Sequence, residues 1–222
     1  YEILRCLVGA EMCIRDRSLM FGTKERPGAN ENDEFIPVTA HGVKLLSMGL
    51  LINESDPVAV RGPLATRYVQ QFLRNVAWGD VDFLILDLPP GTGDIQLTIV
   101  QTAELDGVVV VTTPQEVALI DARKAIGLFE RVETPILGII ENMSYFQCPS
   151  DGKIYHIFGE GGGEREAAKL GVPLLGKIPL DISTRFGGDE GRPVALEDPG
   201  QNPVSAAFRQ VAEQCARVVL DR

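Results

Sequence analysis

The segment LILDLPPGTGD, residues 84–94, combines an acid with a glycine-rich turn. Asp87 ends an apolar run, and an acid at the end of a buried strand is costly unless it is paired or faces a cation. Gly91, Thr92 and Gly93 follow it, and glycines let backbone N–H groups approach a phosphate closely. The segment therefore predicts a Mg²⁺-associated carboxylate beside a phosphate-sensing turn. The alternative is an acid that caps the next helix and is followed by a plain Pro-Gly turn.

Cysteine is the second residue type that could do chemistry. The chain has Cys6, Cys13, Cys148 and Cys215, and none of them forms a close CxxC pair. Four scattered cysteines in 222 residues do not indicate a disulfide framework, so a reducing cytoplasm is the favoured compartment. Cys215 lies on an apolar helical stripe and is predicted to belong to the core.

These residues lie among alternating strand and helix patterns. Apolar runs that suit buried strands of a parallel sheet occupy residues 41–51, 81–88, 106–114, 134–143 and 173–181. Helical spacing of apolar residues marks residues 61–78, 95–103, 117–132, 164–171 and 202–222. The alternation predicts an α/β fold with a doubly wound, mainly parallel sheet and right-handed crossovers. Ligands bind such sheets beyond the carboxyl ends of the strands, which is where the acid and the turn lie.

The two ends of the chain differ in how well they fit this pattern. Residues 1–17 fit neither a strand nor a capped helix, and we expect a non-native leader there, such as translated vector or adapter sequence. A divergent native N-terminus is the alternative. Residues 18–222 are predicted to form a single domain, in which the polar stretch 22–35 is a loop.

Composition narrows the class of partner. The net charge is −10, which does not favour duplex DNA or an anionic membrane surface as a partner. No apolar run approaches the roughly 20 residues that a membrane-spanning helix needs. We therefore expect no nucleic-acid and no membrane partner.

Several long strings follow one another in an order that is similar to one family. They are LILDLPPGTGDIQLT, TTPQEVALIDARKAIGLF, GIIENMSYFQCP, IFGEGGG and LLGKIPLD. Together they resemble the Mrp/ApbC branch of the deviant-Walker P-loop ATPases, the ATP-dependent iron–sulfur cluster carriers of the MinD/ParA superfamily. The resemblance runs from about Ser18 to the C-terminus. It implies a MinD-like fold, bound ATP and Mg²⁺, a homodimer, and apo iron–sulfur proteins as partners.

The resemblance also implies roles for single residues. Asp87 would be the Mg²⁺-associated carboxylate, acting through water, and Gly91 to Gly93 would be the switch that senses the γ-phosphate. Asn142 would hydrogen-bond adenine, because an amide offers both a donor and an acceptor. Pro179 and Asp181 would lie in the other adenine-contacting loop. The alternatives are a turn asparagine at position 142 and a helix N-cap at position 181.

The chain departs from this family in its phosphate loop. Family members begin with a GKGGVGKS/T-type loop that cradles phosphates, and no such string occurs here. The glycine-rich run Gly159 to Gly163 has no following Lys-Ser/Thr, so we interpret it as a family loop of another kind. We expect the first strand and the P-loop helix to be missing, and the chain as given to be inactive in ATP hydrolysis.

The second departure concerns the cluster-binding cysteines. Cluster-carrying members have CPxC, whereas this chain has Cys148-Pro149-Ser150-Asp151. A [4Fe–4S] cluster generally takes four thiolates, and two copies of Cys148 supply two. An exposed loop cysteine without a cluster is the alternative.

The sequence thus favours an ATP-binding iron–sulfur cluster carrier or scaffold, present as a fragment without the phosphate loop. A MinD/ParA-like positioning ATPase, a related kinase or synthetase, and an inactive truncated remnant are the alternatives. A positioning ATPase would need a basic amphipathic C-terminal helix, and the basic bias of residues 202–222 is weak.

Overall fold

The computed structural model describes residues 6–9, 16–51, 62–88 and 94–221. The chain divides into two compact units. Unit 1 comprises Tyr1–Glu104 with Gly187–Arg192, and unit 2 comprises Leu105–Phe186 with Pro193–Arg222. The expected single domain over residues 18–222 stays a prediction.

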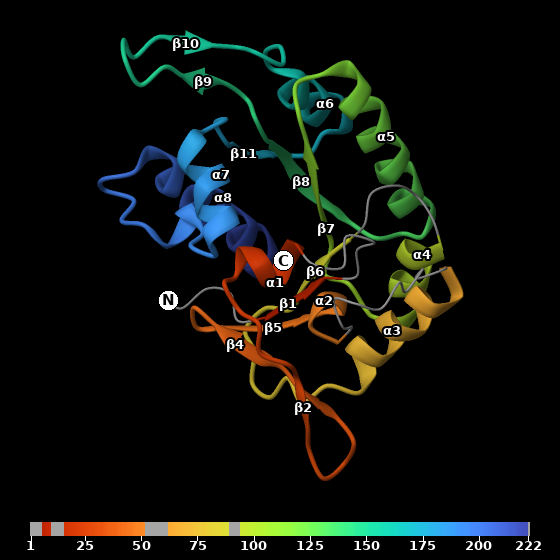
Figure 1. Cartoon of the computed structure of the whole chain (residues 1–222). Coiled ribbons are helices and arrows are strands. Elements are labelled where there is room, and N and C mark those ends of the chain that lie inside the picture. The colour runs from red at the N-terminus through yellow and green to blue at the C-terminus, as the bar shows by residue number, and fades with distance from the viewer. Residues whose placement is uncertain (1–5, 10–15, 52–61, 89–93, 222) are drawn as a thin grey trace. The chain divides into compact units, whose positions relative to one another are not determined.

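A mostly parallel sheet with the strand order β4-β5-β1-β6 lies in unit 1 (Figure 1). The strands are β1 (Cys6–Gly9), β4 (Val38–Ala40), β5 (Val43–Ser47) and β6 (Ile85–Asp87). β1 pairs in parallel with both β5 and β6, and β4 is antiparallel to β5. The helices of this unit are α1 (Asp16–Met20), α2 (Met48–Leu51), α3 (Gly62–Arg74) and α4 (Asp94–Thr102).

The strand β1 corrects an expectation. The N-terminal 17 residues were expected to contribute neither a strand nor a helix, and the fold to lack its first strand. Instead Leu7 pairs with both Leu45 and Ile85, so residues 6–9 lie at the centre of the sheet. The short apolar stretch is enough for a central strand because both of its edges find parallel neighbours. The assignment of residues 1–17 as a non-native leader stays a prediction.

The core of unit 1 forms where α3 covers the sheet. Phe72 and Leu46 are fully buried, and Trp78 joins them with its indole N–H donating to the carbonyl of Phe72. The predicted loop 22–35 contains a small hairpin formed by β2 (Gly28–Ala29) and β3 (Phe35–Ile36). The side-chain oxygen of Asn30 closes its turn by accepting from the backbone N–H of Asn32 and Glu34. Local side-chain bonding of this kind is typical of turns and escapes a search for apolar runs.

Unit 2 has a three-stranded parallel sheet with the order β11-β8-β7. The strands are β7 (Val108–Thr112), β8 (Ile136–Glu141) and β11 (Leu174–Lys177). The helices α5 (Glu116–Arg131) and α6 (Gly162–Leu170) pack on β7 and β8, and α8 (Pro203–Leu220) packs on β8 and β11 (Figure 1). Ile139 and Ile126 are buried between β8 and α5. The parallel strands with helical crossovers confirm the predicted α/β fold class.

A hairpin, a helix and a 3-10 turn complete the region around the site. β9 (Phe146–Gln147) and β10 (Ile154–Tyr155) form an antiparallel hairpin after β8. α7 (Ile182–Glu190) follows β11 and crosses into the part of the chain assigned to unit 1. A 3-10 turn at Val194–Leu196 precedes α8, whose N-cap Asn202 accepts from the N–H groups of Val204 and Ser205. No helix in the described ranges is long and apolar enough to cross a membrane.

Candidate functional site

Asp87 is the last residue of β6, as the sequence predicted. Its Cα is in register with Gly9 of the neighbouring strand β1, so the carboxylate lies at the carboxyl edge of a parallel sheet. The residue is half-buried. Gly91, Thr92 and Gly93, the predicted phosphate-sensing turn, lie outside the described residues. The Mg²⁺ role of Asp87 stays a prediction.

The structure places Asn142 directly after β8. Its backbone N–H donates to the carbonyl of Thr112 at 2.7 Å, which ties it to the end of β7. Its side-chain Oδ1 accepts from the N–H of Met143 at 2.9 Å, and Met143 has a φ of 52°. This bond closes a tight turn, which is the alternative role considered for Asn142. The amide Nδ2 is not needed for the turn, so a donor and the second lone pair of Oδ1 are left for a ligand.

The segment after β11 runs alongside the loop that contains Asn142. The N–H of Ile178 donates to the carbonyl of Glu141 at 2.9 Å, and the N–H of Ser144 donates to the carbonyl of Ile178 at 3.0 Å. The N–H of Leu180 then donates to the carbonyl of Tyr145 at 2.7 Å. Asn142 and the buried Pro179 are thereby carried on two bonded neighbouring segments.

Asp181 has a clear structural role. Its Oδ1 accepts from the backbone N–H of Thr184 at 3.1 Å and from the hydroxyl of Ser183. The carboxylate therefore caps the N-terminus of α7, which was the alternative for this position. A contact to nucleotide stays a prediction, and it would use the carboxylate oxygen that the cap does not.

A residue that the sequence analysis missed lies at the same edge. Thr113 follows β7, and its hydroxyl is buried without a hydrogen-bond partner among the described residues. A buried polar atom without a partner costs free energy, which water or a ligand could recover. Its neighbour Thr112 already holds the backbone of Asn142. The only signal in the sequence was the pair of threonines that follows the valine run. Two polar residues at this point are also what an ordinary strand end would show, so they did not indicate a site.

Cys148 stands at the tip of the β9–β10 hairpin. Its N–H donates to the carbonyl of Lys153, and its carbonyl accepts from the N–H of Gly152, both at 2.8 Å. The thiol lies 3.1 Å from the hydroxyl of Ser150. This hydroxyl stabilises the thiolate and lowers the pKa of Cys148 below its ordinary value. A reactive, accessible thiolate is the form of cysteine that binds metal.

Asp151 shares the tip with Cys148. Its carboxylate accepts from the N–H of Lys153 at 3.1 Å and pairs with the ammonium group of Lys153. These contacts, led by the backbone N–H of Lys153, lower the pKa of Asp151. No group of three or more His, Cys, Asp or Glu side chains suited to a metal occurs in the described part of the chain.

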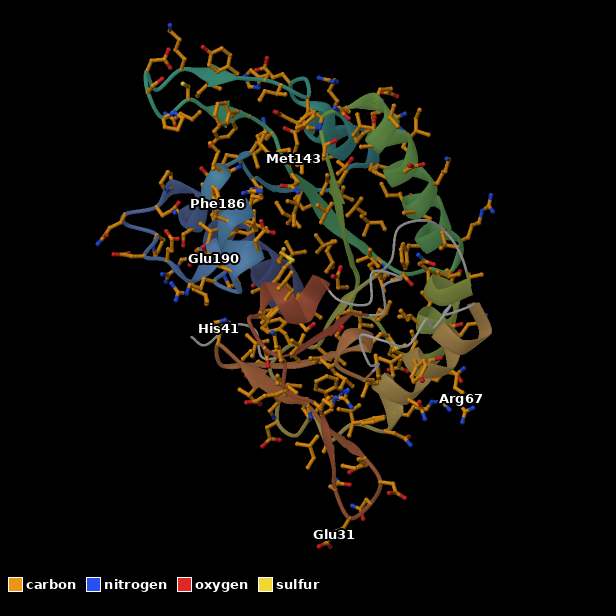
Figure 2. The ribbon with its side chains drawn as sticks, viewed as in Figure 1. Glu31, His41, Arg67, Met143, Phe186 and Glu190 are labelled. Atoms are coloured by element: carbon orange, nitrogen blue, oxygen red, sulfur yellow. The ribbon has the colours of Figure 1, made fainter. Side chains whose placement is uncertain are left out.

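Several apolar side chains on and next to the hairpin are exposed to solvent. Ile154, Tyr155 and Ile157 are exposed on β10 and just after it. Met143, at the foot of the hairpin, is also exposed and is labelled in Figure 2. Exposed apolar side chains that gather in one segment are typical of a surface that meets another molecule.

The glycine-rich run has a packing role. A Cβ atom at Gly162 would lie 2.5 Å from the carbonyl oxygen of Pro114, and one at Gly163 would lie 3.1 Å from Cβ of Glu141. Glycine lets the N-terminus of α6 approach the ends of β7 and β8 this closely. The two glycines therefore serve the packing of α6 against the strand ends, and the interpretation of the run as a loop other than a phosphate loop stays a prediction.

Solved structures share the α/β fold of this chain. A nucleotide-binding protein from Archaeoglobus fulgidus in complex with ADP has 34% sequence identity and a TM-score of 0.73, covering 86% of this chain and 74% of that one. The septum site-determining protein MinD from Pyrococcus horikoshii, complexed with Mg-ADP, has 21% identity and a TM-score of 0.66, over 96% of this chain and 83% of its own. The second likeness concerns the fold alone.

Sequence comparison gives the family. The family model described as "ParA: NUBPL iron-transfer P-loop NTPase" matches residues 6–216, so the chain belongs to this family. An iron-sulfur cluster carrier protein from Pseudomonas fragi is 40% identical over 213 residues, which are 95% of this chain and 74% of that protein. The iron-sulfur protein required for NADH dehydrogenase from Arabidopsis thaliana is 44% identical over 199 residues, which are 90% of this chain and 63% of the relative. The chain covers only 55% of the length of an iron-sulfur cluster carrier protein from Aquifex aeolicus.

Proposed function

We propose that this chain is part of an ATP-dependent iron–sulfur cluster carrier, in which the Cys148 hairpin holds the cargo and the Asn142 edge holds the base of the nucleotide. The observation that carries the proposal is the position of Cys148. Its thiol lies at the exposed tip of a hairpin, beside a hydroxyl that favours the thiolate. A carrier must release its cluster to another protein, and a thiolate at a projecting tip suits that exchange.

The residues at the carboxyl edge of unit 2 fit an adenine base. Asn142 offers an amide donor, and Pro179 lies on the adjoining segment, where a flat apolar ring can pack against a base. The hydroxyl of Thr113, which has no hydrogen-bond partner among the described residues, is a further polar group at this edge. Asp87 in unit 1 would hold Mg²⁺ through water, as the acid at the end of the corresponding strand does in P-loop NTPases.

The phosphate side of such a site needs groups that this sequence lacks. Phosphoryl transfer depends on backbone amides and a lysine that cradle the β- and γ-phosphates. No GKGGVGKS/T-type string occurs in the 222 residues. We therefore propose nucleotide binding through the base, and no turnover, for the chain as given.

The cargo would be shared between two copies of the chain. A symmetric homodimer places the same hairpin on both sides of its two-fold axis, so two Cys148 thiolates could meet. The exposed apolar residues Ile154, Tyr155 and Ile157 beside the tip would be covered in such a dimer. Two thiolates hold two corners of a [4Fe–4S] cluster, and Asp151 or a small thiol would complete it. Carboxylate and exchangeable ligands bind such a cluster weakly, which gives a labile cargo.

The proposed partners are apo iron–sulfur proteins, with neither nucleic acid nor membrane as a ligand. The cytoplasm is the proposed compartment, because a reducing environment keeps Cys148 available as a thiolate.

Anaerobic reconstitution of the purified chain with iron and sulfide tests the proposal. We expect a cluster absorbance that Cys148→Ala abolishes, and Asp151→Cys should increase cluster retention against a chelator. Cys215→Ala is the matched control, since this thiol lies on α8 where burial raises its pKa. Stoichiometric iron and sulfide that survive Cys148→Ala would refute the assignment.

A further inference from the structure

Glu141 is a fully buried acid at the carboxyl end of β8. Burying a carboxylate is costly unless both of its oxygens find donors. Here the hydroxyl of Ser144 donates to Oε1, and the backbone N–H of Gly163 donates to Oε2 at 2.7 Å. One side chain therefore bonds two segments that are about 20 residues apart along the chain, counted from the numbers of Ser144 and Gly163.

These two segments flank the Cys148 hairpin in the chain. Ser144 lies just before β9, and Gly163 lies in the first turn of α6, soon after β10. A second contact closes the same base, because Nδ1 of His156 lies 3.3 Å from the carbonyl oxygen of Ser144. The hairpin is thus held at its base, while its tip is exposed.

The same carboxylate also fixes the turn that carries Asn142. Asn142 lies between Glu141 and the left-handed Met143, and Ser144 ends the turn. Backbone bonds to Thr112 and Ile178 hold this turn from the strand side. The hydrogen bond from the Ser144 hydroxyl to the Glu141 carboxylate adds a side-chain contact that holds the same turn. Glycine, asparagine and aspartate tolerate left-handed backbone, whereas a φ near +50° is costly for methionine, so this turn needs such fixing.

We propose that Glu141 is a positioning residue that fixes the Asn142 turn and the base of the Cys148 hairpin as one unit, and so couples base recognition to the cargo hairpin. The coupling part rests on the proposed function, whereas the anchoring of the hairpin does not. Because Asn142 and Ser144 are two residues apart, a base that draws on the Asn142 amide acts on the turn that Glu141 holds. The carboxylate acts through its two hydrogen bonds and contacts neither base nor cluster.

Two substitutions of similar size separate hydrogen bonding from packing. Glu141→Gln keeps a carbonyl oxygen for the N–H of Gly163 and an amide that the Ser144 hydroxyl can accept from. Glu141→Met fills the space but offers no acceptor. Glu166→Met, at a second buried acid on α6, is the matched control for placing methionine at a buried carboxylate. Ser144→Ala removes one of the two donors to Glu141 without opening a cavity. This variant replaces Glu141→Met in the test if that variant fails to fold.

Hydrogen–deuterium exchange of the nucleotide-free chain is the first measurement. In Glu141→Met the amide of Gly163 should exchange at least about tenfold faster than in the wild type, because its only acceptor in the described structure is lost. Glu141→Gln should stay within about twofold, and Glu166→Met should not change the amides of residues 144–163 selectively. Equal exchange at Gly163 in the Met and Gln variants would overturn the anchoring role.

The second measurement is the ratio of the ATP and GTP dissociation constants. Glu141→Met should reduce the preference for ATP by about tenfold, and Ser144→Ala should shift it in the same direction. If the wild-type chain binds ATP and GTP equally, the proposed base-binding function is wrong. The exchange rate at Gly163 would then still test whether Glu141 anchors the hairpin. A wild-type preference that Glu141→Met and Ser144→Ala leave unchanged would reject the coupling alone.

Discussion

Arg123 on α5 forms two hydrogen bonds with the carboxylate of Glu166 on α6, from Nε to Oε2 at 2.9 Å and from Nη2 to Oε1 at 2.7 Å. Lys169 adds a third donor at 2.8 Å. The side chain of Glu166 is only 6% exposed and that of Arg123 is 37% exposed, so the ion pair joins the two helices with a buried carboxylate and a partly exposed guanidinium. Arg123 first, and then Lys169, lower the pKa of Glu166 from 4.5 to about 2.

Stability at acid pH should therefore depend on Glu166. The folded pKa is lowered, so the ionised group stabilises the fold above the unfolded value of 4.5, and this contribution is lost as the pH falls toward about 2. Glu166→Gln should cost about 1–3 kcal/mol at neutral pH and should flatten the loss of stability below the unfolded pKa. Urea unfolding at neutral pH and at pH about 3 measures both effects. Asp121→Asn, which removes an exposed pair with Lys124, should change little.

Alanine at Gly162 should destabilise the protein, because its Cβ would meet the carbonyl oxygen of Pro114 at 2.5 Å. Relieving this clash requires a backbone shift, and such overpacking typically lowers the free energy of unfolding by about 1–3 kcal/mol. Gly127 is the matched control, since a Cβ there meets nothing within 4 Å on the helix α5. Gly127→Ala should stabilise the chain by roughly 0.5–1 kcal/mol. Thermal denaturation of both variants measures the difference, and a loss of stability in Gly127→Ala as large as in Gly162→Ala would contradict it.

Asn142→Ala should lower the preference for ATP over GTP by about tenfold, since it removes a contact to the edge of the base. Asn142→Asp separates this role from the turn. A carboxylate keeps an oxygen for the N–H of Met143 but loses the amide donor. Competition binding of the two nucleotides is the measurement. If Asn142→Asp keeps the full preference, the amide serves the turn and not the base.

Removal of the Ser150 hydroxyl should make Cys148 less reactive near neutral pH. The hydroxyl is the first cause of the lowered pKa of Cys148, so Ser150→Ala should raise that pKa. The thiolate fraction at a given pH then falls, and the pH profile of alkylation shifts upward. Mass spectrometry of the Cys148 peptide after timed alkylation gives the profile, and Cys215 in the same sample provides the internal control. An unchanged Cys148 profile in Ser150→Ala would mean that other groups set its pKa.

The chain as given should release no phosphate from ATP above the level of Asp87→Asn. The reason is the absence of a lysine-bearing phosphate loop from the sequence. A steady-state phosphate-release assay at saturating MgATP makes the comparison. Turnover that Asp87→Asn abolishes would show that other residues replace this loop.

The regular elements were predictable because their apolar residues follow simple periods. The strand pattern at 134–143 contains β8, and the helical pattern at 117–132 matches α5 within one residue at each end. The hairpin β9–β10 was missed because its strands have two residues each, too short for a period of two to appear. α7 was missed because Gly187 and Gly188 interrupt its pattern.

The site was predictable in residue types but not in the bonds that each residue makes. Asn142 and Asp181 were singled out for a ligand, and the structure shows what their side chains also do within the chain. Glu141 was not singled out, because an acid inside a strand string reveals its two donors only when the turn after β8 and the N-terminus of α6 come together. Such pairings across distant segments carry no local signal in a single sequence.

The arrangement of the β9–β10 hairpin has a consequence for how the protein can change over time. The sheet of unit 2 is bonded to the base of the hairpin, and the tip from Cys148 to Lys153 bonds mainly to itself. Under the proposed function, substitutions at the tip would therefore change the ligands that it offers to a cluster while leaving the core side chains untouched. A protein with this hairpin could then gain or lose a thiol at a position such as Asp151 while the strand ends that carry Asn142 keep their structure.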